Sequence, residues 1–256
     1  PRSLRKHMYA LYAFCRHTDD IGDESVGNRL ELLDFWESQL ELCYTGIPAH
    51  PILLALKDTI TLFGIPKILF AKIIEANRMD QGLVRFETYQ DLLHYCDHSA
   101  NPVGRMVMHV LGSSKESDLK LSDHICTALQ LTNFWQDITL DLEKGRIYLP
   151  QEDMEKFGYS EAQLIHKKLT QGFRELMHFE IERTVTLFEA GRPLLNEIHG
   201  RIKLDITLFI KGGMSILKSI RNADYDVLNS RPTVTRVRKA WLMTSTAFKL
   251  IALNRT

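Results

Sequence analysis

Between Gln130 and Asp141 the chain reads QLTNFWQDITLD. Asn133, Asp137 and Asp141 are spaced four residues apart, so on an α-helix their side chains would form one stripe along a single face. Bulky apolar residues flank this stripe, namely Phe134, Trp135, Ile138 and Leu140. Such surroundings are typical of a recessed site, where an uncompensated carboxylate costs several kcal/mol. The stretch therefore predicts a helix whose carboxylates are neutralised by a cation.

A second acidic stretch, RHTDDIGDE, occupies residues 16–24 and continues an apolar helical pattern. Its Asp19 and Asp23 are again four residues apart, which on a helix brings their Cβ atoms to about 5–6 Å and makes the two charges repel. Aspartate is also a poor helix former, so the local sequence does nothing to favour this arrangement. Both stretches therefore share one requirement, which is a bound cation.

Magnesium is the cation that the two stretches favour, because Mg²⁺ takes oxygen ligands from one or two carboxylates and completes its shell with water and phosphate oxygens. A single aspartate pair at this spacing is more typical of a solvated helix face, but two such stripes beside aromatic residues reverse that preference. Calcium is the weaker candidate, since the sequence contains no EF-hand loop. The predicted metal ligands are Asp19, Asp23, Asn133, Asp137 and Asp141.

Helices are predicted throughout the chain, because apolar residues recur at three- and four-residue steps and sustained strand-like alternation is missing. Ser160 and Gln163 form the pattern of a capping box at the start of one helix. The predicted helices cover residues 3–24, 27–46, 50–63, 66–80, 88–111, 118–143, 160–199, 201–229 and 233–254. With no repeat and no low-complexity linker, the predicted fold class is all-α, a single-domain helical bundle over residues 1–256.

Charge balance and hydropathy argue against nucleic acid as a partner and against a membrane-spanning segment. The 32 basic and 32 acidic side chains cancel, which excludes a general attraction to nucleic acid. No apolar run approaches the ~18 residues of a membrane span and the first residues lack a signal-peptide pattern, so a cytoplasmic protein is expected. The 4 cysteines lack C-x-x-C spacing and are expected to be reduced thiols.

The segment from Val227 onward has no acidic residue but several basic ones. A charged outer face of the last helix is the simpler interpretation of this pattern. Peripheral contact with the cytoplasmic membrane is the functional alternative, with Trp241 and Phe248 on one side of the segment. The sequence predicts no oligomeric state.

The two acidic stretches resemble the aspartate motifs of the squalene/phytoene synthase family, the trans-prenyl head-to-head synthases. The similarity covers essentially the whole chain. The first motif resembles YAFCR at residues 12–16 leading to Asp19, Asp20 and Asp23, and the second resembles Gln130 to Asp141 followed by KGRIYLP at residues 144–150. A further family aspartate matches Asp80, and the family's active-site tyrosine matches Tyr95 fifteen residues on.

This resemblance implies an isoprenoid synthase fold with a central active-site cavity, a Mg²⁺ cofactor and a prenyl diphosphate lipid substrate. The segments NPVGR at residues 101–105 and NFWQD at residues 133–137 are most similar to the hydroxysqualene synthase branch of bacterial hopanoid biosynthesis. In that branch presqualene diphosphate and water give hydroxysqualene and pyrophosphate.

The residues expected to act in this chemistry are taken from the motifs. Catalytic roles are expected for Asp19, Asp23, Asp137, Asp141 and Tyr95, and the four aspartates are also expected to bind the metal together with Asn133. The expected substrate-binding residues are Arg16, Asp80, Asn101, Gln130, Asn133, Gln136, Arg146 and Tyr148. Aromatic faces that could shelter a carbocation belong to Phe14, Tyr95, Phe134 and Tyr148. His17, although next to the aspartates, does not share their helix face and is left out of the site.

The chain departs from the common family pattern at two places. Gln136 stands where that pattern carries an arginine before the second-motif aspartate, and we hypothesise that Gln136 and Asn101 position the capturing water. The serine-containing segment that many relatives place before the first helix is not found ahead of Pro1. Either the chain is truncated there or part of the pyrophosphate pocket is missing.

Two alternative functions remain open. The first is the ordinary condensing reaction of the family, which forms squalene, dehydrosqualene or phytoene from two farnesyl or geranylgeranyl diphosphates. The few glycines form no dinucleotide-binding loop, which argues against complete reduction to squalene. The second is a non-catalytic assembly factor that keeps the fold. Intact aspartates weigh against that alternative, because a scaffold has no need of repelling carboxylates.

Overall fold

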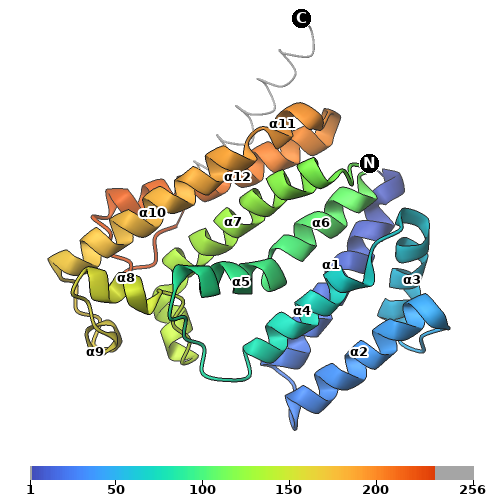
Figure 1. Ribbon diagram of the computed structural model, residues 1–256, viewed down its shortest axis with the longest axis horizontal. Helices are drawn as coiled ribbons and strands as arrows, with labels where there is room; N and C mark the ends of the chain where they lie inside the picture. The colour runs from blue at the N-terminus through green and yellow to red at the C-terminus, as the bar shows by residue number, and fades with distance from the viewer. Residues whose placement is uncertain (1, 234–256) are drawn as a thin grey trace, which may run out of the picture. The chain divides into compact units, whose positions relative to one another are not determined.

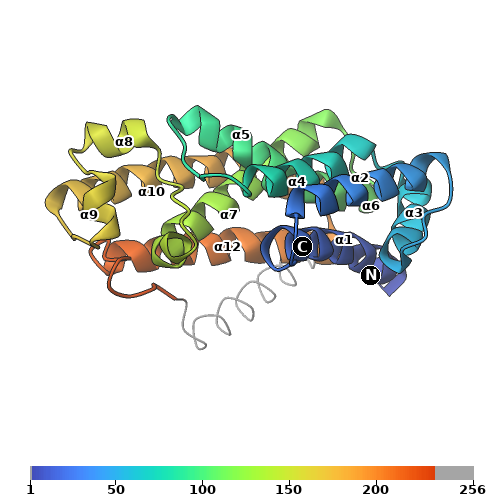
Figure 2. The same ribbon diagram turned by 90° about the horizontal axis from the view of Figure 1, so that it is seen from below.

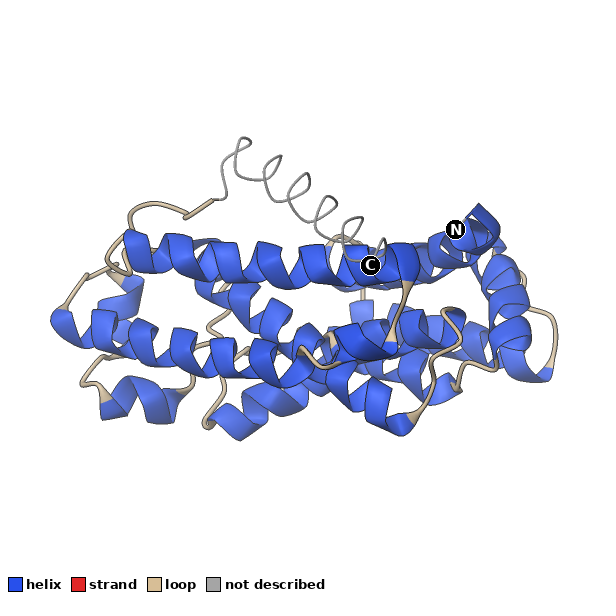
Figure 3. Cartoon of the chain, turned by 90° about the horizontal axis from the view of Figure 1, so that it is seen from above, coloured by secondary structure: helices blue, strands red, loops and turns tan. Residues whose placement is uncertain are grey.

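The structure is a computed structural model that describes residues 2–233, and every regular element in that range is a helix (Figure 3). The all-α prediction is therefore confirmed for this part of the chain. The helices are η1 (Arg2–Leu4), α1 (Arg5–Asp23), α2 (Arg29–Thr45), α3 (Pro51–Phe63), α4 (Lys67–Met79), α5 (Tyr89–Ser99), α6 (Asn101–Val110), α7 (Glu116–Glu143), α8 (Gln151–Lys156), α9 (Glu161–Ile165), α10 (Gln171–Gly191), α11 (Leu194–Glu197) and α12 (Gly200–Asn222). Within residues 2–233, no helix is long and apolar enough to cross a membrane.

The helices form two compact units. The first unit comprises the residues up to Val84 together with Leu93–Cys126. The second comprises Arg85–Leu92 together with the residues from Thr127 on. The chain passes between the units in the loop after Val84, inside α5 after Leu92 and inside α7 after Cys126. Each unit has its own packed helices, and the single domain predicted over residues 1–256 stays a prediction.

In the first unit, α1 packs against α2, α3, α4 and α6 (Figures 1 and 2). Phe14 of α1 is fully buried, and its ring stacks on Trp36 at 5.8 Å and meets Phe70 edge-on at 5.1 Å. The indole N–H of Trp36 donates a 3.0 Å hydrogen bond to Oγ1 of the buried Thr18. This core fixes the rotation of α1 about its axis, and so determines which face of α1 carries the acidic residues.

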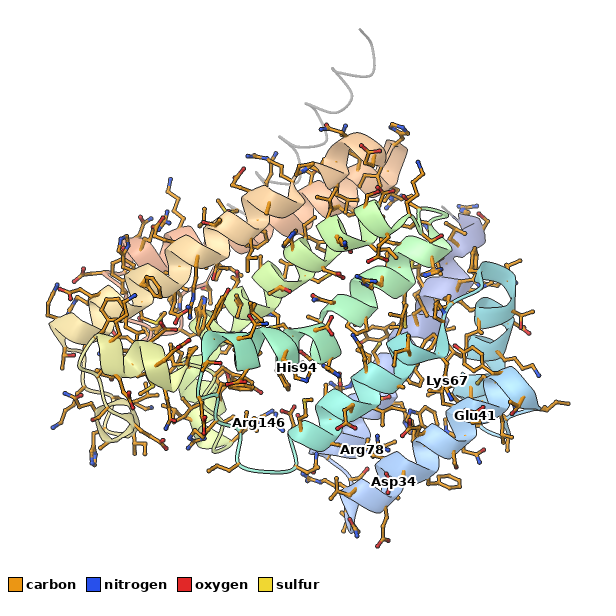
Figure 4. The ribbon with its side chains drawn as sticks, in the orientation of Figure 1. Asp34, Glu41, Lys67, Arg78, His94 and Arg146 are labelled. Carbon is orange, nitrogen blue, oxygen red and sulfur yellow. The ribbon has the colours of Figure 1, made fainter. Side chains whose placement is uncertain are left out.

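Ion pairs hold α4 against α2. Nη2 of Arg78 lies 2.8 Å from Asp34 (Figure 4). The same atom lies 2.6 Å from Glu37. Nearer the start of α4, Nζ of Lys67 lies 2.5 Å from Glu41 (Figure 4). A guanidinium shared by two carboxylates is held more firmly than a single surface ion pair. The last turn of α4, which comes just before Asp80, is thereby kept in place.

In the second unit, the C-terminal half of α7 packs on α10, and α10 packs on α12. Trp135 of α7 is fully buried, and its indole N–H donates to Oγ1 of Thr184 in α10 at 2.9 Å. Gly213 lets α12 approach α10 closely, because a Cβ at this position would lie only 2.5 Å from the ring of Phe188. The second acidic stretch is therefore carried on a firmly packed helix.

A buried charge cluster joins α8 to α10 in the same unit. The guanidinium of Arg183 contacts Oε1 and Oε2 of Glu180 at 2.5 and 2.7 Å, and Oδ2 of Asp153 at 2.6 Å. Glu180 is 0% exposed and Asp153 is 5% exposed. Two buried carboxyl groups thus share one partly buried guanidinium.

Several predicted helix boundaries are wrong. The helix expected over residues 88–111 is broken at Ala100, because Pro102 lacks an N–H and favours the first turn of a new helix. The helix expected over residues 160–199 is broken after α9, where Lys167 has φ 50° and the Thr170 side chain caps α10. It is broken again near Pro193, at the start of α11. The short helix α8 was not predicted.

The capping box at Ser160 is confirmed. The Ser160 hydroxyl accepts from the backbone N–H of Gln163, and the Gln163 side chain accepts from the backbone N–H of Ser160. The helix predicted over residues 233–254, with its proposed membrane contact, lies outside the residues that the structure describes.

Candidate active site

Asp19 and Asp23 lie one turn apart on α1, and Asn77 of α4 contacts the first of them. Nδ2 of Asn77 donates to Oδ1 of Asp19 at 3.3 Å. The two helices can approach this closely because residue 22 is glycine: a Cβ on Gly22 would lie 2.3 Å from Oδ1 of Asn77. Nε2 of Gln81 also donates to the Gly22 carbonyl, at 3.0 Å. The amide side chains of Asn77 and Gln81 therefore both contact the first aspartate motif.

The sequence interpretation missed the roles of Asn77 and Gln81. The available signal was that Asn77 and Gln81, which flank Asp80, are four residues apart, a spacing that places two amide groups on one side of a helix end. Their contacts with α1 depend on tertiary packing, which that spacing does not reveal.

The electrostatic environment of Asp19 disfavours its charge. The pKa of Asp19 is raised, first because burial partly desolvates the carboxyl group and further because Asp23 and Asp20 repel its charge. The hydrogen bond from Asn77 and the charge of Arg16 lower the pKa and offset part of that rise. A bound cation would relieve the repulsion between Asp19 and Asp23, as the sequence predicts for a metal site.

Arg16 is engaged with other acidic residues of the same helix end. Its Nη2 lies 2.5 Å from Oδ1 of Asp20 and 3.0 Å from Oε1 of Glu24. The side chains of Arg16 and Glu24 are exposed, and that of Asp20 is partly exposed. The predicted role of Arg16 in diphosphate binding would therefore require exchange of an exposed ion pair, which is worth only about 0–1 kcal/mol.

Asp80 and Tyr95 are in contact. The Tyr95 hydroxyl donates to Oδ2 of Asp80 at 2.9 Å, and Tyr95 is 5% exposed. Asp80 ends α4, where its backbone N–H bonds to the Ala76 carbonyl. The contact orients the tyrosine hydroxyl through a charged acceptor, which makes a stronger hydrogen bond than a neutral one.

The second acidic stripe lies on α7, as predicted. Asn133 is exposed and Asp137 is partly exposed, whereas Phe134, Trp135 and Ile138 are buried. Leu140 is 44% exposed, so the expectation that it shelters the stripe is wrong. The stripe thus borders solvent on one side and the core of the second unit on the other.

Arg231 and Pro232, which follow α12, contact this stripe. Nε and Nη2 of Arg231 lie 2.5 and 3.0 Å from Oδ1 and Oδ2 of Asp137. Nε2 of Gln136 donates to the carbonyl of Pro232 at 2.6 Å, and Gln136 is 7% exposed. No sequence signal pointed to Arg231 as a partner of Asp137, because the two residues are 94 positions apart.

A tight turn after α7 brings Arg146 and Tyr148 back beside Asp141. Gly145 makes this turn with φ 74°, and the Arg146 N–H bonds to the Asp141 carbonyl at 2.8 Å. The ring of Tyr148 stacks on Phe134 with centroids 3.8 Å apart and an interplanar angle of 8°. These four side chains line one small recess of about 10 Å³, which is room for a single water.

The remaining predicted residues are divided between the units. Asn101 begins α6 in the first unit and is 8% exposed. Gln130 is partly buried on α7 in the second unit. Of the predicted site residues, the first unit holds Arg16, Asp19, Asp23, Asp80, Tyr95 and Asn101, and the second holds Gln130, Asn133, Gln136, Asp137, Asp141, Arg146 and Tyr148. Cooperation between the two sets stays a prediction.

The prediction that Phe14 shelters a carbocation is wrong, whereas leaving His17 out of the site agrees with its contacts. Phe14 is 0% exposed between Trp36 and Phe70, so it belongs to the core and cannot face a substrate cation. His17 packs against Trp36 and His50 with centroids 4.6 and 4.9 Å apart. It therefore faces away from Asp19, as its position on α1 indicated.

The donor atoms of both motifs suit magnesium. Among residues 2–233, no group of three or more His, Cys, Asp or Glu side chains forms a ready metal site. The groups that each motif offers are carboxylate and amide oxygens, which are the ligands that Mg²⁺ prefers. Burial raises the pKa of Asp19 and repulsion from Asp23 adds to the rise, so added positive charge would be favourable there. The oxygen donors of the two motifs therefore fit Mg²⁺, and the assignment of individual ligands stays a prediction.

Curated proteins with similar sequences are phytoene synthases. The chain is 33% identical over 255 residues to "Phytoene synthase" of Arthrospira platensis, covering 93% of this chain and 82% of that protein. It is 32% identical over 262 residues to "15-cis-phytoene synthase" of Synechocystis sp., covering 94% of this chain and 78% of that protein.

Two solved structures with the same fold are named as synthases. The crystal structure of squalene synthase HpnC from Alicyclobacillus acidocaldarius matches with a TM-score of 0.86 at 41% identity, covering 88% of this chain and 86% of that one. A dehydrosqualene synthase in complex with ligand matches with a TM-score of 0.87 at 25% identity, covering 98% of this chain and 89% of that one.

A chain that matches these structures, carries two aspartate stripes and has only helices in its described part is an isoprenoid synthase. Residues 1–238 match the family described as squalene/phytoene synthase, and the chain belongs to that family. It is therefore an enzyme of the family whose members bind prenyl diphosphates and condense them head to head. Members of this family use a divalent metal to ionise the diphosphate.

Proposed function

We propose that the chain ionises presqualene diphosphate with the help of Mg²⁺ and captures water to give hydroxysqualene and pyrophosphate. The observation that carries this choice is the 41% identity to squalene synthase HpnC, against 33% and 32% to the two phytoene synthases. The resemblance of NPVGR at residues 101–105 and NFWQD at residues 133–137 to the hydroxysqualene synthase branch points the same way.

The proposed metal ligands are the oxygen donors of the two motifs, Asp19, Asp23, Asn133, Asp137 and Asp141. Bound there, Mg²⁺ would act as a Lewis acid on the leaving diphosphate. The guanidinium of Arg146, next to Asp141 in the recess of the second unit, would donate to diphosphate oxygens in the forked geometry that suits phosphate. Tyr95, held by Asp80, would present its oriented hydroxyl to the same group.

In the proposed reaction the bond between the substrate carbon and the diphosphate oxygen breaks, and its electron pair leaves with the diphosphate. The oxygen of a water molecule then bonds to the carbocation and the water loses a proton. Aromatic rings attract a cation by ~0.5–2 kcal/mol each, and Phe134 and Tyr148 form such a surface beside Asp141.

Water capture is proposed to depend on Gln136 and Asn101. Because Nε2 of Gln136 donates its hydrogen bond to the Pro232 carbonyl, Gln136 would orient water through its Oε1 atom. Gln136→Arg should therefore lower the share of alcohol among the products. An unchanged alcohol yield in this variant would remove Gln136 from water delivery.

The alternative function is head-to-head condensation of two farnesyl or geranylgeranyl diphosphates, and the names of the curated relatives favour it. One experiment separates the two. The pure protein with Mg²⁺ is incubated with presqualene diphosphate, and separately with farnesyl and geranylgeranyl diphosphate, and the lipid products are identified. Hydroxysqualene from presqualene diphosphate supports the proposal, whereas phytoene, squalene or dehydrosqualene from the prenyl diphosphates supports condensation. No product from any substrate would favour a non-catalytic assembly factor.

A further inference from the structure

The contact between Arg231 and Asp137 is a two-point ion pair. Nε faces Oδ1 at 2.5 Å and Nη2 faces Oδ2 at 3.0 Å, so each carboxylate oxygen receives its own donor. The side chains are 47% exposed for Arg231 and 25% exposed for Asp137. This forked geometry is the strongest arrangement that arginine makes with a carboxylate.

The loop that carries Arg231 is anchored on both sides of the arginine. On one side, Val227 and Leu228 are 0% and 3% exposed. On the other side, Pro232 is buried and its carbonyl accepts the 2.6 Å hydrogen bond from Gln136. Arg231 is therefore held beside the acidic stripe by contacts that do not involve its own side chain.

The ion pair conflicts with the metal-binding role proposed for Asp137. Both oxygens of Asp137 already face a positive group that neutralises the carboxylate. A divalent cation that takes either oxygen must displace a guanidinium N–H and must accept a nearby positive charge. The guanidinium that is displaced needs a new anionic partner, and a diphosphate group offers one with matching geometry.

We propose that Arg231 guards Asp137 against divalent metal in the absence of diphosphate and transfers to the diphosphate when metal and diphosphate bind together. This inference rests on the proposed function, because it takes Asp137 as a metal ligand. Metal alone then binds weakly. Adding diphosphate increases the metal affinity for two reasons, because its oxygens are metal ligands and because it takes Arg231 away from Asp137. Gln136 is a positioning residue in this scheme, since it holds the Pro232 carbonyl and with it the loop.

The test measures binding of Mn²⁺ as a spectroscopic substitute for Mg²⁺, first alone and then with saturating inorganic pyrophosphate. It compares the wild-type protein with Arg231→Gln, Arg231→Lys and Gln136→Met. The matched control is Arg192→Gln, which removes an exposed arginine whose ion pair with Glu189 lies within α10 and its C-cap. Circular dichroism and melting temperature establish that each variant is folded.

Arg231→Gln should bind Mn²⁺ alone about three- to tenfold more tightly than wild type, because the competing cation is gone. The gain in Mn²⁺ affinity on adding pyrophosphate should be smaller in this variant by about tenfold. Arg231→Lys keeps the positive charge but loses the two-point contact, so both quantities should lie between those of wild type and Arg231→Gln. This variant replaces Arg231→Gln in the test if Arg231→Gln does not fold. Gln136→Met should change both quantities in the same direction, and Arg192→Gln should change neither.

Equal or weaker binding of Mn²⁺ alone in Arg231→Gln and Arg231→Lys overturns the guarding role while leaving the proposed function intact. A wild-type protein that binds neither Mn²⁺ nor Mn²⁺ with pyrophosphate overturns the proposed function and this inference together. A merely structural role for Arg231 would lower the melting temperature without the selective gain in metal affinity.

Discussion

The Tyr95 hydroxyl donates a 2.9 Å hydrogen bond to Oδ2 of Asp80 within the first unit. The two residues are fifteen positions apart, one at the end of α4 and the other in α5. Both match family positions that are expected to act on the diphosphate, and the structure shows that they are physically coupled. Loss of either partner should therefore disturb the other.

Tyr95→Phe should lower the rate of product formation by at least about tenfold, because an oriented hydroxyl is lost from the site. The cost in unfolding free energy should stay near 0.5–1.5 kcal/mol, about that of one hydrogen bond. Steady-state kinetics and urea denaturation measure the two effects. A variant that keeps the wild-type rate would show that Tyr95 has only a packing role.

Gly22→Ala should lower the free energy of unfolding by about 1–3 kcal/mol, because the added Cβ would lie 2.3 Å from Oδ1 of Asn77 and push α1 away from α4. Gly212→Ala is the matched control, since Gly212 is also within a helix and no atom lies within 4 Å of its added Cβ. That control should be stabilised by about 0.5–1 kcal/mol, as alanine suits a helix better than glycine. Urea denaturation measures both, and equal effects would contradict the close approach.

Glu180 should make stability depend on pH. Burial raises its pKa to about 8 from an ordinary value of 4.5, and nearby Asp153 adds to the rise while Arg183 opposes it. Between these two values the folded protein keeps a proton that the unfolded chain releases, so the unfolding free energy should fall as pH rises through this window. The fall should amount to a few kcal/mol.

Glu180→Gln mimics the protonated group and cannot titrate. The difference in unfolding free energy between wild type and this variant, measured by urea denaturation from about pH 5 to 8, should therefore decrease as pH rises. A constant or increasing difference would mean that Glu180 is ionised in the folded protein, with Arg183 as its counter-ion.

Features that depend on neighbours in sequence were predictable. The helical placement of both aspartate stripes follows from four-residue spacing, and the capping box at Ser160 follows from two residues three apart. The break before Pro102 had a signal in the sequence that outweighed the apolar periodicity of residues 88–111. Phe14 was wrongly placed in the site because an aromatic residue beside acidic ones looks the same whether it packs inward or lines a cavity.

Contacts between distant residues were not predictable. The approach of Asn77 to Gly22 depends on how α1 packs against α4, which no local pattern specifies. The pair of Arg231 with Asp137 joins residues 94 positions apart. For the basic segment that contains Arg231, the sequence indicated only a solvated face or a membrane contact. The partner of Gln136 is likewise a backbone carbonyl, which sequence comparison cannot identify.

The central claim is that both aspartate motifs bind one magnesium–diphosphate group, and thermal unfolding with ligand tests it most directly. Mg²⁺ with inorganic pyrophosphate at about 100 times its Kd should stabilise the wild-type protein by about 2.7 kcal/mol, which raises the melting temperature by several degrees. Asp19→Asn and Asp137→Asn should each abolish most of that rise. If either variant keeps the full rise in melting temperature, one motif alone binds the ligand and the claim fails.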